Sequence, residues 1–194
     1  MAAQIHPTAI VETGATIGDG TSIWDNVHIR APSTIGRDCI IGEKTYIAYG
    51  VDIGDRVKIN AMVYICTGIT IETGAMISAG TIFTNDRFPR ATTSDLSELR
   101  SSAPDESTGK TVVREGSTIG AGSIIGSGLE VGRFSMVGMG SVLTRSVPDH
   151  ALVLGNPARQ VGLVCRCGEV LDENLGCGGC GCAYQMSDGA VTDR

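Results

Sequence analysis

A repeat of six residues runs through the first part of the chain and limits what it can fold into. Fourteen consecutive positions spaced six apart are apolar: Ile5, Val11, Ile17, Ile23, Ile29, Ile35, Ile41, Ile47, Ile53, Ile59, Ile65, Ile71, Ile77 and Phe83. A period of six fits neither an amphipathic helix nor an alternating strand. The fifth residue of each hexad is small or β-branched nearly throughout, so a hexad suits a short strand plus a turn around a narrow interior.

The rhythm stops after Phe83 and returns at Ile119, from which it continues to Leu143. The hexads therefore enclose an insertion, which we place at residues 85–118. Coiled hexads form a solenoid, in which each coil covers the apolar face of the next. We expect residues 1–160 to form this solenoid domain and residues 161–194 to form a cysteine-rich tail.

Composition and charge exclude several classes of function. The formal net charge is -6 and there is no basic run, which disfavours a nucleic-acid partner. The N-terminal residues lack the charged and apolar regions of a signal peptide, and no apolar run approaches the length of a membrane span. We therefore expect a cytoplasmic protein with no membrane partner.

If three hexads make one coil, residues eighteen apart stack in columns along the solenoid. One corner column reads Gly18, Gly36 and Gly54, as expected of a turn, whereas another carries Glu12, Arg30 and Cys66. An outward column beside that corner runs through Ile10, His28, Tyr46, Tyr64 and Ile82, and Tyr49 and Thr67 lie below Asn85. This polar and aromatic edge is either a groove for a long polar ligand or an interface between subunits.

The insertion carries Arg87, Arg90 and Arg100 among polar and acidic residues. Long loops in compact solenoids are usually functional or disordered. Two arginines next to Asn85 and Asp86 suit bidentate binding of phosphate or carboxylate. The alternative is that they are solvated charges paired with Asp86 or Asp95.

The hexads closely resemble those of the hexapeptide-repeat acyltransferases, over about residues 5 to 160. The resemblance implies an all-β fold, a left-handed parallel β-helix with three hexads per coil. The nineteen hexads would make about six coils, with one long inserted loop and a small zinc-knuckle-like tail.

Four segments make the resemblance narrower: "IWDNVHI", "VKINAMVYICTGITIE", "FTNDRFPRA" and "GNPAR". They are similar to bacterial N-acetyltransferases that acetylate a 3-amino group on a nucleotide-linked sugar. This implies a homotrimer in which the acceptor sugar and acetyl-CoA meet between two subunits. The asparagine of the "TND" motif, Asn85, would be the catalytic residue that positions the sugar. Candidates for binding the nucleotide sugar are Asp86, Arg87, Arg90, His28, Arg30, Tyr49 and Tyr64.

The chain departs from the subfamily pattern after Trp24, where Asp25 stands in place of the more usual histidine. This difference leaves the identity of the sugar open, but not the acyl-transfer class.

The resemblance also implies that acetyl-CoA lies along the C-terminal coils. Glycines there would let the pantetheine approach the backbone, and arginines would meet its phosphates. The matching positions are Gly138, Gly140, Ser141, Arg145, Asn156, Pro157 and Arg159. As structure alone, the "GNPAR" segment is a turn that caps the coil.

The simplest chemistry is direct attack of a neutral amine on the thioester, with backbone donors holding the tetrahedral intermediate. A base role for His28 is disfavoured, because it lies three coils below Ile82, about 14 Å at the spacing of stacked strands. Cys66 is either a buried small residue or the site of an acyl-enzyme.

Five of the seven cysteines lie between residues 165 and 182 as C-x-C and C-x2-C pairs. In a cytoplasmic protein such pairs favour zinc over disulfides. Cys165, Cys167, Cys177 and Cys180 would complete a tetrahedral set for structural zinc, with Cys182 left over. The alternative is a loose tail with reduced thiols.

Three other functions compete with amino-sugar acetylation. A γ-class carbonic anhydrase is disfavoured because no suitable histidine cluster occurs on adjacent coils. A non-catalytic assembly subunit, or an O- or N-acyltransferase with a different small acceptor, stays open.

Overall fold

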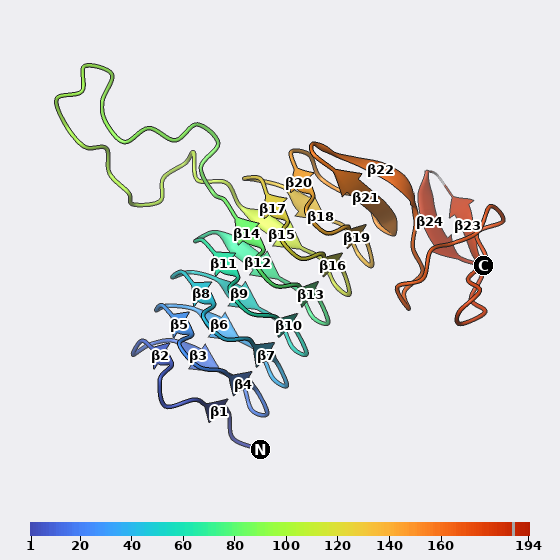
Figure 1. Cartoon of the computed structure of the whole chain (residues 1–194), viewed down its shortest axis with the longest axis horizontal. Coiled ribbons are helices and arrows are strands. Elements are labelled where there is room, and N and C mark those ends of the chain that lie inside the picture. Colours follow the sequence, from blue (N-terminus) through green and yellow to red (C-terminus); the bar gives the residue numbers. More distant parts are fainter. Residues whose placement is uncertain (188) are drawn as a thin grey trace.

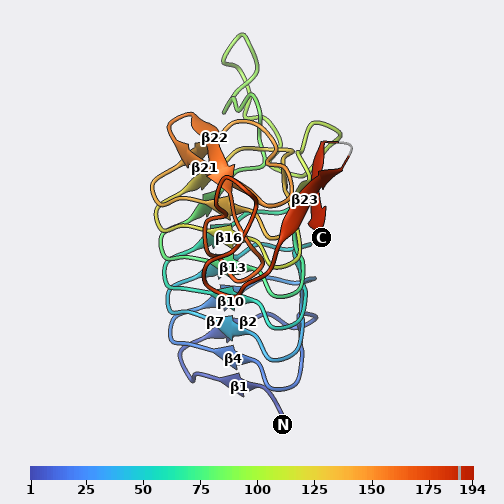
Figure 2. The ribbon, with the colours of Figure 1, turned by 90° about the vertical axis from the view of Figure 1, so that its right-hand side faces the viewer.

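The chain forms a coil of short parallel strands on three faces. The computed structural model describes residues 1–187 and 189–194, and within these ranges it contains strands and turns but no helix. Strand partners on one face lie eighteen residues apart, as in the pairs of Tyr46 with His28 and with Tyr64. Figure 2 shows successive turns stacked along the axis. The chain is therefore the parallel β-helix that the hexads predict.

Each face of the coil is one sheet, and the tail adds a hairpin. The first sheet contains β1 (Gln4–Ile5), β4 (Ser22–Ile23), β7 (Ile40–Ile41), β10 (Lys58–Ile59), β13 (Met76–Ile77), β16 (Thr118–Ile119), β19 (Met136–Val137), β21 (Ala151–Gly155) and β22 (Ala158–Leu163). The second sheet contains β2 (Ile10–Val11), β5 (His28–Ile29), β8 (Tyr46–Ile47), β11 (Tyr64–Ile65), β14 (Ile82–Phe83), β17 (Ile124–Ile125) and β20 (Val142–Leu143). The third sheet contains β3 (Thr16–Ile17), β6 (Thr34–Ile35), β9 (Asp52–Ile53), β12 (Ile69–Ile71), β15 (Thr111–Val113) and β18 (Glu130–Val131). The tail hairpin pairs β23 (Tyr184–Ser187) with β24 (Ala190–Asp193).

The two inward positions of the hexad fill the interior. The large residue closes each strand and is fully buried in the middle coils, as at Ile29, Ile41 and Ile59. The small residue lies at the corner, where a hydroxyl satisfies a buried carbonyl of the next coil. Thr21 donates to the Gly36 carbonyl at 2.7 Å, so a polar inward residue carries no unpaired group.

The corners require left-handed backbone and close stacking. One residue per hexad commonly has positive φ, either glycine or a residue such as Asn26 (54°) or Asp38 (56°). At Gly36 a Cβ atom would lie 2.5 Å from the backbone of Gly54 in the next coil. Only glycine fits there, which explains the corner column of glycines.

The insertion is shorter than the sequence predicts. The coil resumes at β15, which pairs with β12 and lies inside the predicted insertion of 85–118, so residues 84–110 are the ones outside the coil. Val113 is in phase with Ile119 and fully buried, but a single hexad directly after a polar loop gives no repeat to recognise. The coil is also longer than six turns, because the first sheet holds eight parallel strands.

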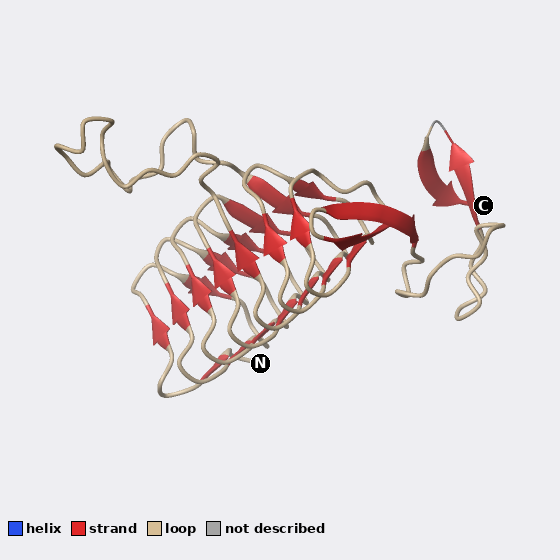
Figure 3. Cartoon of the chain, turned by 45° about the horizontal axis from the view of Figure 1, so that its top comes forward, coloured by secondary structure: helices blue, strands red, loops and turns tan. Residues whose placement is uncertain are grey.

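The loop and the tail leave the coil in different directions (Figures 1 and 3). The loop, green in Figure 1, projects from the region of β14 and β15. At the C-terminal end β22 returns antiparallel to β21, and this hairpin leads into the tail. No helix long and apolar enough to cross a bilayer occurs in residues 1–187 and 189–194.

Two neighbouring residues of β7 test this description of the core. Ile41 is fully buried, whereas Ile40 on the same strand is 41% exposed. We expect Ile41→Ala to lower the free energy of unfolding by about 2–5 kcal/mol, because it removes buried methyl groups and leaves a cavity. Ile40→Ala is the control and should cost much less. Equal losses in denaturant unfolding would contradict the assignment of faces.

Candidate functional site

Three aromatic rings form a ladder on the outer side of the second sheet. The His28 and Tyr46 rings meet edge to face with centroids 5.5 Å apart, and the Tyr46 and Tyr64 rings stack at 5.2 Å with an interplanar angle of 12°. The strand register places the three residues directly above one another. The predicted column is therefore confirmed as a continuous row of rings in contact, of which Tyr46 and Tyr64 are stacked.

Glu12 fixes the lower end of this ladder. One carboxylate oxygen accepts hydrogen bonds from His28 Nε2 at 3.0 Å and Arg30 Nε at 3.2 Å, and the other accepts the Ala31 amide at 3.0 Å. The Ala31 amide, His28 and Arg30 lower the pKa of the Glu12 carboxyl. The guanidinium of Arg30 lies over the Tyr49 ring at 5.4 Å. His28 and Arg30 are thus held in place by Glu12. The sequence places Glu12 in the same corner column as Arg30, but it was not predicted as a site residue.

A pocket of about 820 Å³ lies between the ladder and the inserted loop. Tyr46, Tyr64 and Cys66 belong to its coil side. Six of the predicted site residues line it: Tyr49, Tyr64, Asn85, Asp86, Arg87 and Arg90. His28 and Arg30 are not among the lining residues, but they contact Tyr46 and Tyr49, which are. The coil and the loop together therefore bring most of the residues predicted to bind the nucleotide sugar to one place.

Asn85 lies where the chain leaves the coil after β14. Its main-chain carbonyl accepts hydrogen bonds from the Gly109 amide at 2.9 Å and from the Ser127 hydroxyl at 2.8 Å. These bonds join the two ends of the loop and anchor Asn85 to the next turn. Asn85 lines the pocket, and within the described residues its side-chain amide has no hydrogen-bond partner. Asn85 thus combines a fixed backbone with a free amide.

The loop arginines are not neutralised by the carboxylates that the sequence offered as partners. Arg87 lies over Phe88 at 5.5 Å and Arg90 donates to the Pro89 carbonyl at 2.9 Å. Among the described residues neither forms a salt bridge. Asp95 instead accepts hydrogen bonds from Thr93 and Ser97, which lower its pKa to about 2. Two cations on the pocket wall are therefore available to an anionic ligand.

Arg100 also lines the pocket, although it is ten residues beyond Arg90 in the sequence. The loop folds back on itself through a bridge between Thr92 and Leu99, and the Arg100 amide donates to the Ala91 carbonyl at 3.0 Å. No local sequence signal indicates this return. The polar loop sequence alone could not place Arg100 at the site.

Cys66 lines the pocket but is poorly suited to attack a thioester. Only 6% of the residue is exposed, and burial raises the pKa of its thiol to about 11. The reactive form of cysteine is the thiolate, which is scarce at neutral pH for such a group. This argues against the acyl-enzyme alternative.

The predicted cofactor residues lie at the C-terminal end of the coil, and none of them lines this pocket. Asn156 and Pro157 form the exposed tip of the hairpin of β21 and β22, and Arg159 is exposed beside this tip. Arg145, which follows β20, is also exposed. Gly140 has a φ of +68° and open space where a Cβ would be. Asn156, Pro157, Arg145, Arg159 and Gly140 are therefore exposed to a ligand in the single chain.

Two further predicted cofactor residues have structural roles. Ser141 is fully buried, and its hydroxyl accepts the Gly155 amide at 3.1 Å, so its predicted contact with acetyl-CoA is not supported. A Cβ at Gly138 would lie 2.0 Å from Leu154 Cδ2. Close packing of the hairpin against position 138 therefore gives this glycine a structural role.

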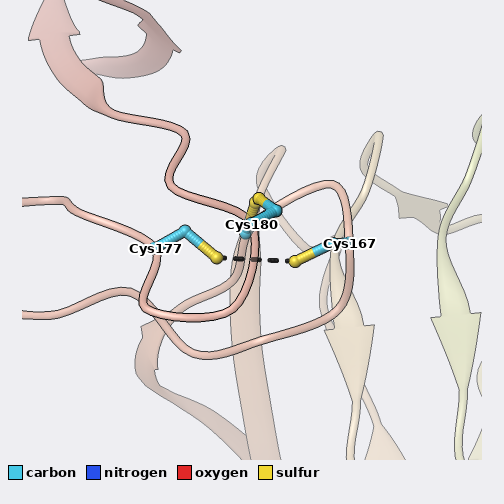
Figure 4. Close-up of side chains that lie close together, drawn as sticks. Cys167, Cys177 and Cys180 are labelled. Carbon is cyan, nitrogen blue, oxygen red and sulfur yellow. Dashed lines mark hydrogen bonds between the residues drawn. The ribbon is translucent and has the colours of Figure 1, made fainter.

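Four cysteines of the tail gather their sulfur atoms in one cluster. The sulfurs of Cys165, Cys167, Cys177 and Cys180 all lie within 4.8 Å of one another. Figure 4 shows Cys167, Cys177 and Cys180 converging from two turns, with Cys167 and Cys177 Sγ 3.4 Å apart. All four are free thiols, and Cys182 is exposed outside the cluster. A tetrahedral zinc with bonds of about 2.3 Å needs sulfurs about 3.8 Å apart, so the cluster fits this ion after small shifts.

Known proteins match this chain in its hexad repeats and, in one relative, over nearly its whole length. The model of bacterial transferase hexapeptides (six repeats) matches residues 14–49, and that of the hexapeptide repeat of succinyl-transferase matches residues 111–145. A dTDP-3-amino-3,6-dideoxy-alpha-D-galactopyranose 3-N-acetyltransferase from Aneurinibacillus thermoaerophilus is 42% identical over 190 residues, covering 97% of this chain and 93% of the relative.

Solved structures of nucleotide-sugar enzymes have a similar fold. A mutant of AntD, an N-acyltransferase from Bacillus cereus, in complex with dTDP and coenzyme A is 25% identical, covers 84% of this chain and 82% of its own, and has a TM-score of 0.56. A second AntD mutant with the same ligands has a TM-score of 0.63 at 23% identity, covers 81% of this chain and 91% of its own, and supports the fold alone. With the near full-length relative, these findings show that the chain belongs to the hexapeptide-repeat acyltransferases, in the group of the nucleotide-linked amino-sugar N-acetyltransferases.

Proposed function

We propose that this protein transfers the acetyl group of acetyl-CoA to the 3-amino group of a nucleotide-linked amino sugar. The observation that carries the proposal is the free amide of Asn85 in a pocket between stacked aromatic rings and unpaired arginines. A relative with 42% identity over almost the whole chain is named for this reaction on a dTDP-linked 3-amino sugar. The sequence and the pocket thus support the same chemistry.

The pocket offers a separate group to each part of such a substrate. Asn85 would hold the sugar, because its amide both donates and accepts hydrogen bonds. Arg87 and Arg90 would bind the diphosphate, or an acidic group on the sugar, together with Asp86 as a hydroxyl partner. Tyr49 and Tyr64 would contact the nucleotide, and His28 and Arg30 would support them from the lower coils.

The reaction needs no covalent enzyme intermediate. The neutral amine attacks the thioester carbonyl, the C–N bond forms, and backbone N–H groups hold the oxyanion of the tetrahedral intermediate. The C–S bond then breaks, and the departing thiolate accepts the proton from the amine. The protonated, buried Cys66 has no part in these steps, and His28 is held by Glu12 on a lower coil. Positioning of the two substrates would supply much of the rate.

Acetyl-CoA would lie along the C-terminal coils beside the hairpin tip at Asn156 and Pro157. Gly140 leaves the backbone accessible there, Gly138 lies against Leu154 of the hairpin, and Arg145 and Arg159 would contact the phosphates. Ser141 supports this arrangement by accepting the Gly155 amide, because the whole residue is buried.

A homotrimer would complete the site. The second sheet exposes a column of apolar and aromatic residues, Ile10, Tyr64, Ile82 and Ile124, each at least 40% exposed. Such a column is suited to an interface between copies of the chain. A partner would cover the ladder and bring its own C-terminal coils toward the sugar.

The thiol cluster would hold a structural zinc ion through Cys165, Cys167, Cys177 and Cys180. Four thiolates with no open position are typical of structural rather than catalytic zinc. Unpaired thiols of this kind persist in a reducing compartment, which supports a cytoplasmic location.

Thiol release from acetyl-CoA with a panel of UDP- and dTDP-linked 3-amino sugars tests the reaction. We expect release with at least one amino sugar and none with the matching sugars that lack the amine. Binding of acetyl-CoA without turnover would mean a different amine or hydroxyl acceptor. Absence of both turnover and acetyl-CoA binding by calorimetry would contradict the proposal and favour a non-catalytic assembly subunit.

Replacement of Asn85 tests its assigned role. We expect Asn85→Ala to lower kcat/KM about 100-fold, because a misplaced sugar loses the geometry of attack. Asn60→Ala, at a corner outside the pocket, is the matched control and should keep normal turnover. Light scattering should give the same oligomer for both variants. Near-normal turnover of Asn85→Ala would remove Asn85 from the site.

Removal of the metal tests its structural role. We expect a chelator to release zinc and expose the segment after β22 to proteolysis, with little change in the initial rate at saturating substrates. An immediate loss of turnover on chelation would mean instead that the metal supports the catalytic site.

A further inference from the structure

The thiol cluster is joined to the coil by a column of three rings, two of which are buried. Phe134 lies at a corner of the coil between β18 and β19, His150 lies just before β21, and Tyr184 begins β23 in the tail. The centroids of Phe134 and His150 are 5.5 Å apart, and those of His150 and Tyr184 are 5.2 Å apart. His150 is 5% exposed and Tyr184 is 1% exposed. The tail therefore packs onto the coil through an imidazole ring shared between them.

Hydrogen bonds fix this imidazole against the first residues of the tail. His150 Nδ1 lies 2.8 Å from the Val164 carbonyl oxygen, so Nδ1 carries the proton and donates it. In return the Val164 amide donates to the His150 carbonyl at 2.7 Å. Cys165, the first member of the cluster, follows directly. The coil thus fixes the position of Cys165, the first cysteine of the cluster.

The Tyr184 hydroxyl extends the column to the sulfur itself. It lies 3.1 Å from Cys165 Sγ and accepts a hydrogen bond from the Arg166 amide at 3.2 Å. Because the amide occupies one side of the oxygen, the hydroxyl proton is directed at the sulfur. A donor of this kind orients a thiolate and stabilises its charge in a metal site.

Arg166 makes a second contact between the tail and the coil. The Arg166 guanidinium lies 5.2 Å from the centre of the Phe134 ring and donates to Asp193 in β24 at 2.6 Å. On the coil side, a Cβ at Gly116 would lie 2.4 Å from Phe134 Cε1, so glycine is needed for this ring to take its place. The packing of Phe134 therefore involves the coil below it as well as the tail.

We propose that Tyr184 is a positioning residue of the metal site and couples it to the last turns of the coil. Its hydroxyl orients Cys165 Sγ. Its ring packs on His150, so that ordering of the cluster by the metal also orders β21 and β22. This inference rests on the zinc site proposed above, but not on the identity of the acyl acceptor. Zinc binding therefore stabilises the hairpin that carries Asn156 and Pro157.

Zinc affinity measured against a chromophoric chelator tests the hydroxyl. We expect Tyr184→Phe to bind Zn²⁺ at least about tenfold more weakly than the wild type, the loss typical of an outer-sphere partner. Tyr64→Phe, which removes a hydroxyl far from the cluster, is the matched control and should bind normally. Equal affinity of Tyr184→Phe and the wild type would overturn the inference. Absence of zinc binding by the wild type would instead contradict the zinc proposal.

Hydrogen exchange of the wild-type protein tests the coupling without any variant. We expect removal of zinc to reduce protection in residues 151–163, and to leave the middle coils, such as residues 40–65, unchanged. Tyr184→Phe saturated with zinc should keep the protection of the hairpin, because the ring is retained, whereas Tyr184→Ala should lose it. Unchanged protection of the hairpin in the zinc-free wild type would contradict the coupling.

Discussion

The register of eighteen residues per turn is the constraint on which the rest of the structure depends. Inward isoleucines of successive turns stack on one another, and each turn is hydrogen-bonded to the next, so neither can move alone. The same register decides which outward residues meet. A histidine and two tyrosines eighteen apart must become a ladder, and Glu12 must lie beside Arg30. Core packing and site geometry thus have one origin.

The site forms where this regularity is interrupted. The coil continues past the loop with its strands in the same register. Ile77 pairs with Ile119, which takes the place that a residue eighteen positions after Ile77 would have in an uninterrupted coil. The loop can therefore carry arginines and a pocket wall without disturbing the core. Asn85 is positioned by both parts, through its backbone bonds to Gly109 and Ser127. A rigid coil with one irregular wall suits a reaction that depends on holding two substrates in place.

The sequence predicts the features that follow from the period, and fails where contacts are not periodic. The aromatic column, the corner glycines and the four-cysteine set can be predicted, because each follows from spacing alone. Val113 was missed because one hexad after a polar loop has no neighbour to reveal its phase. Ser141 was misassigned because its burial depends on the hairpin folding back. Arg100 and Tyr184 reach their sites through long-range folding of the loop and tail, which no local pattern encodes.

A crystal structure with CoA and a dTDP-linked 3-amino-3,6-dideoxyhexose would test the central claim most directly. The account predicts the sugar amine within hydrogen-bond distance of the Asn85 amide, and about 3–4 Å from the CoA sulfur. The nucleotide should lie along the ladder of His28, Tyr46 and Tyr64, with the diphosphate near Arg87 and Arg90. A sugar nucleotide bound away from this ladder, with Asn85 contacting neither ligand, would contradict the account.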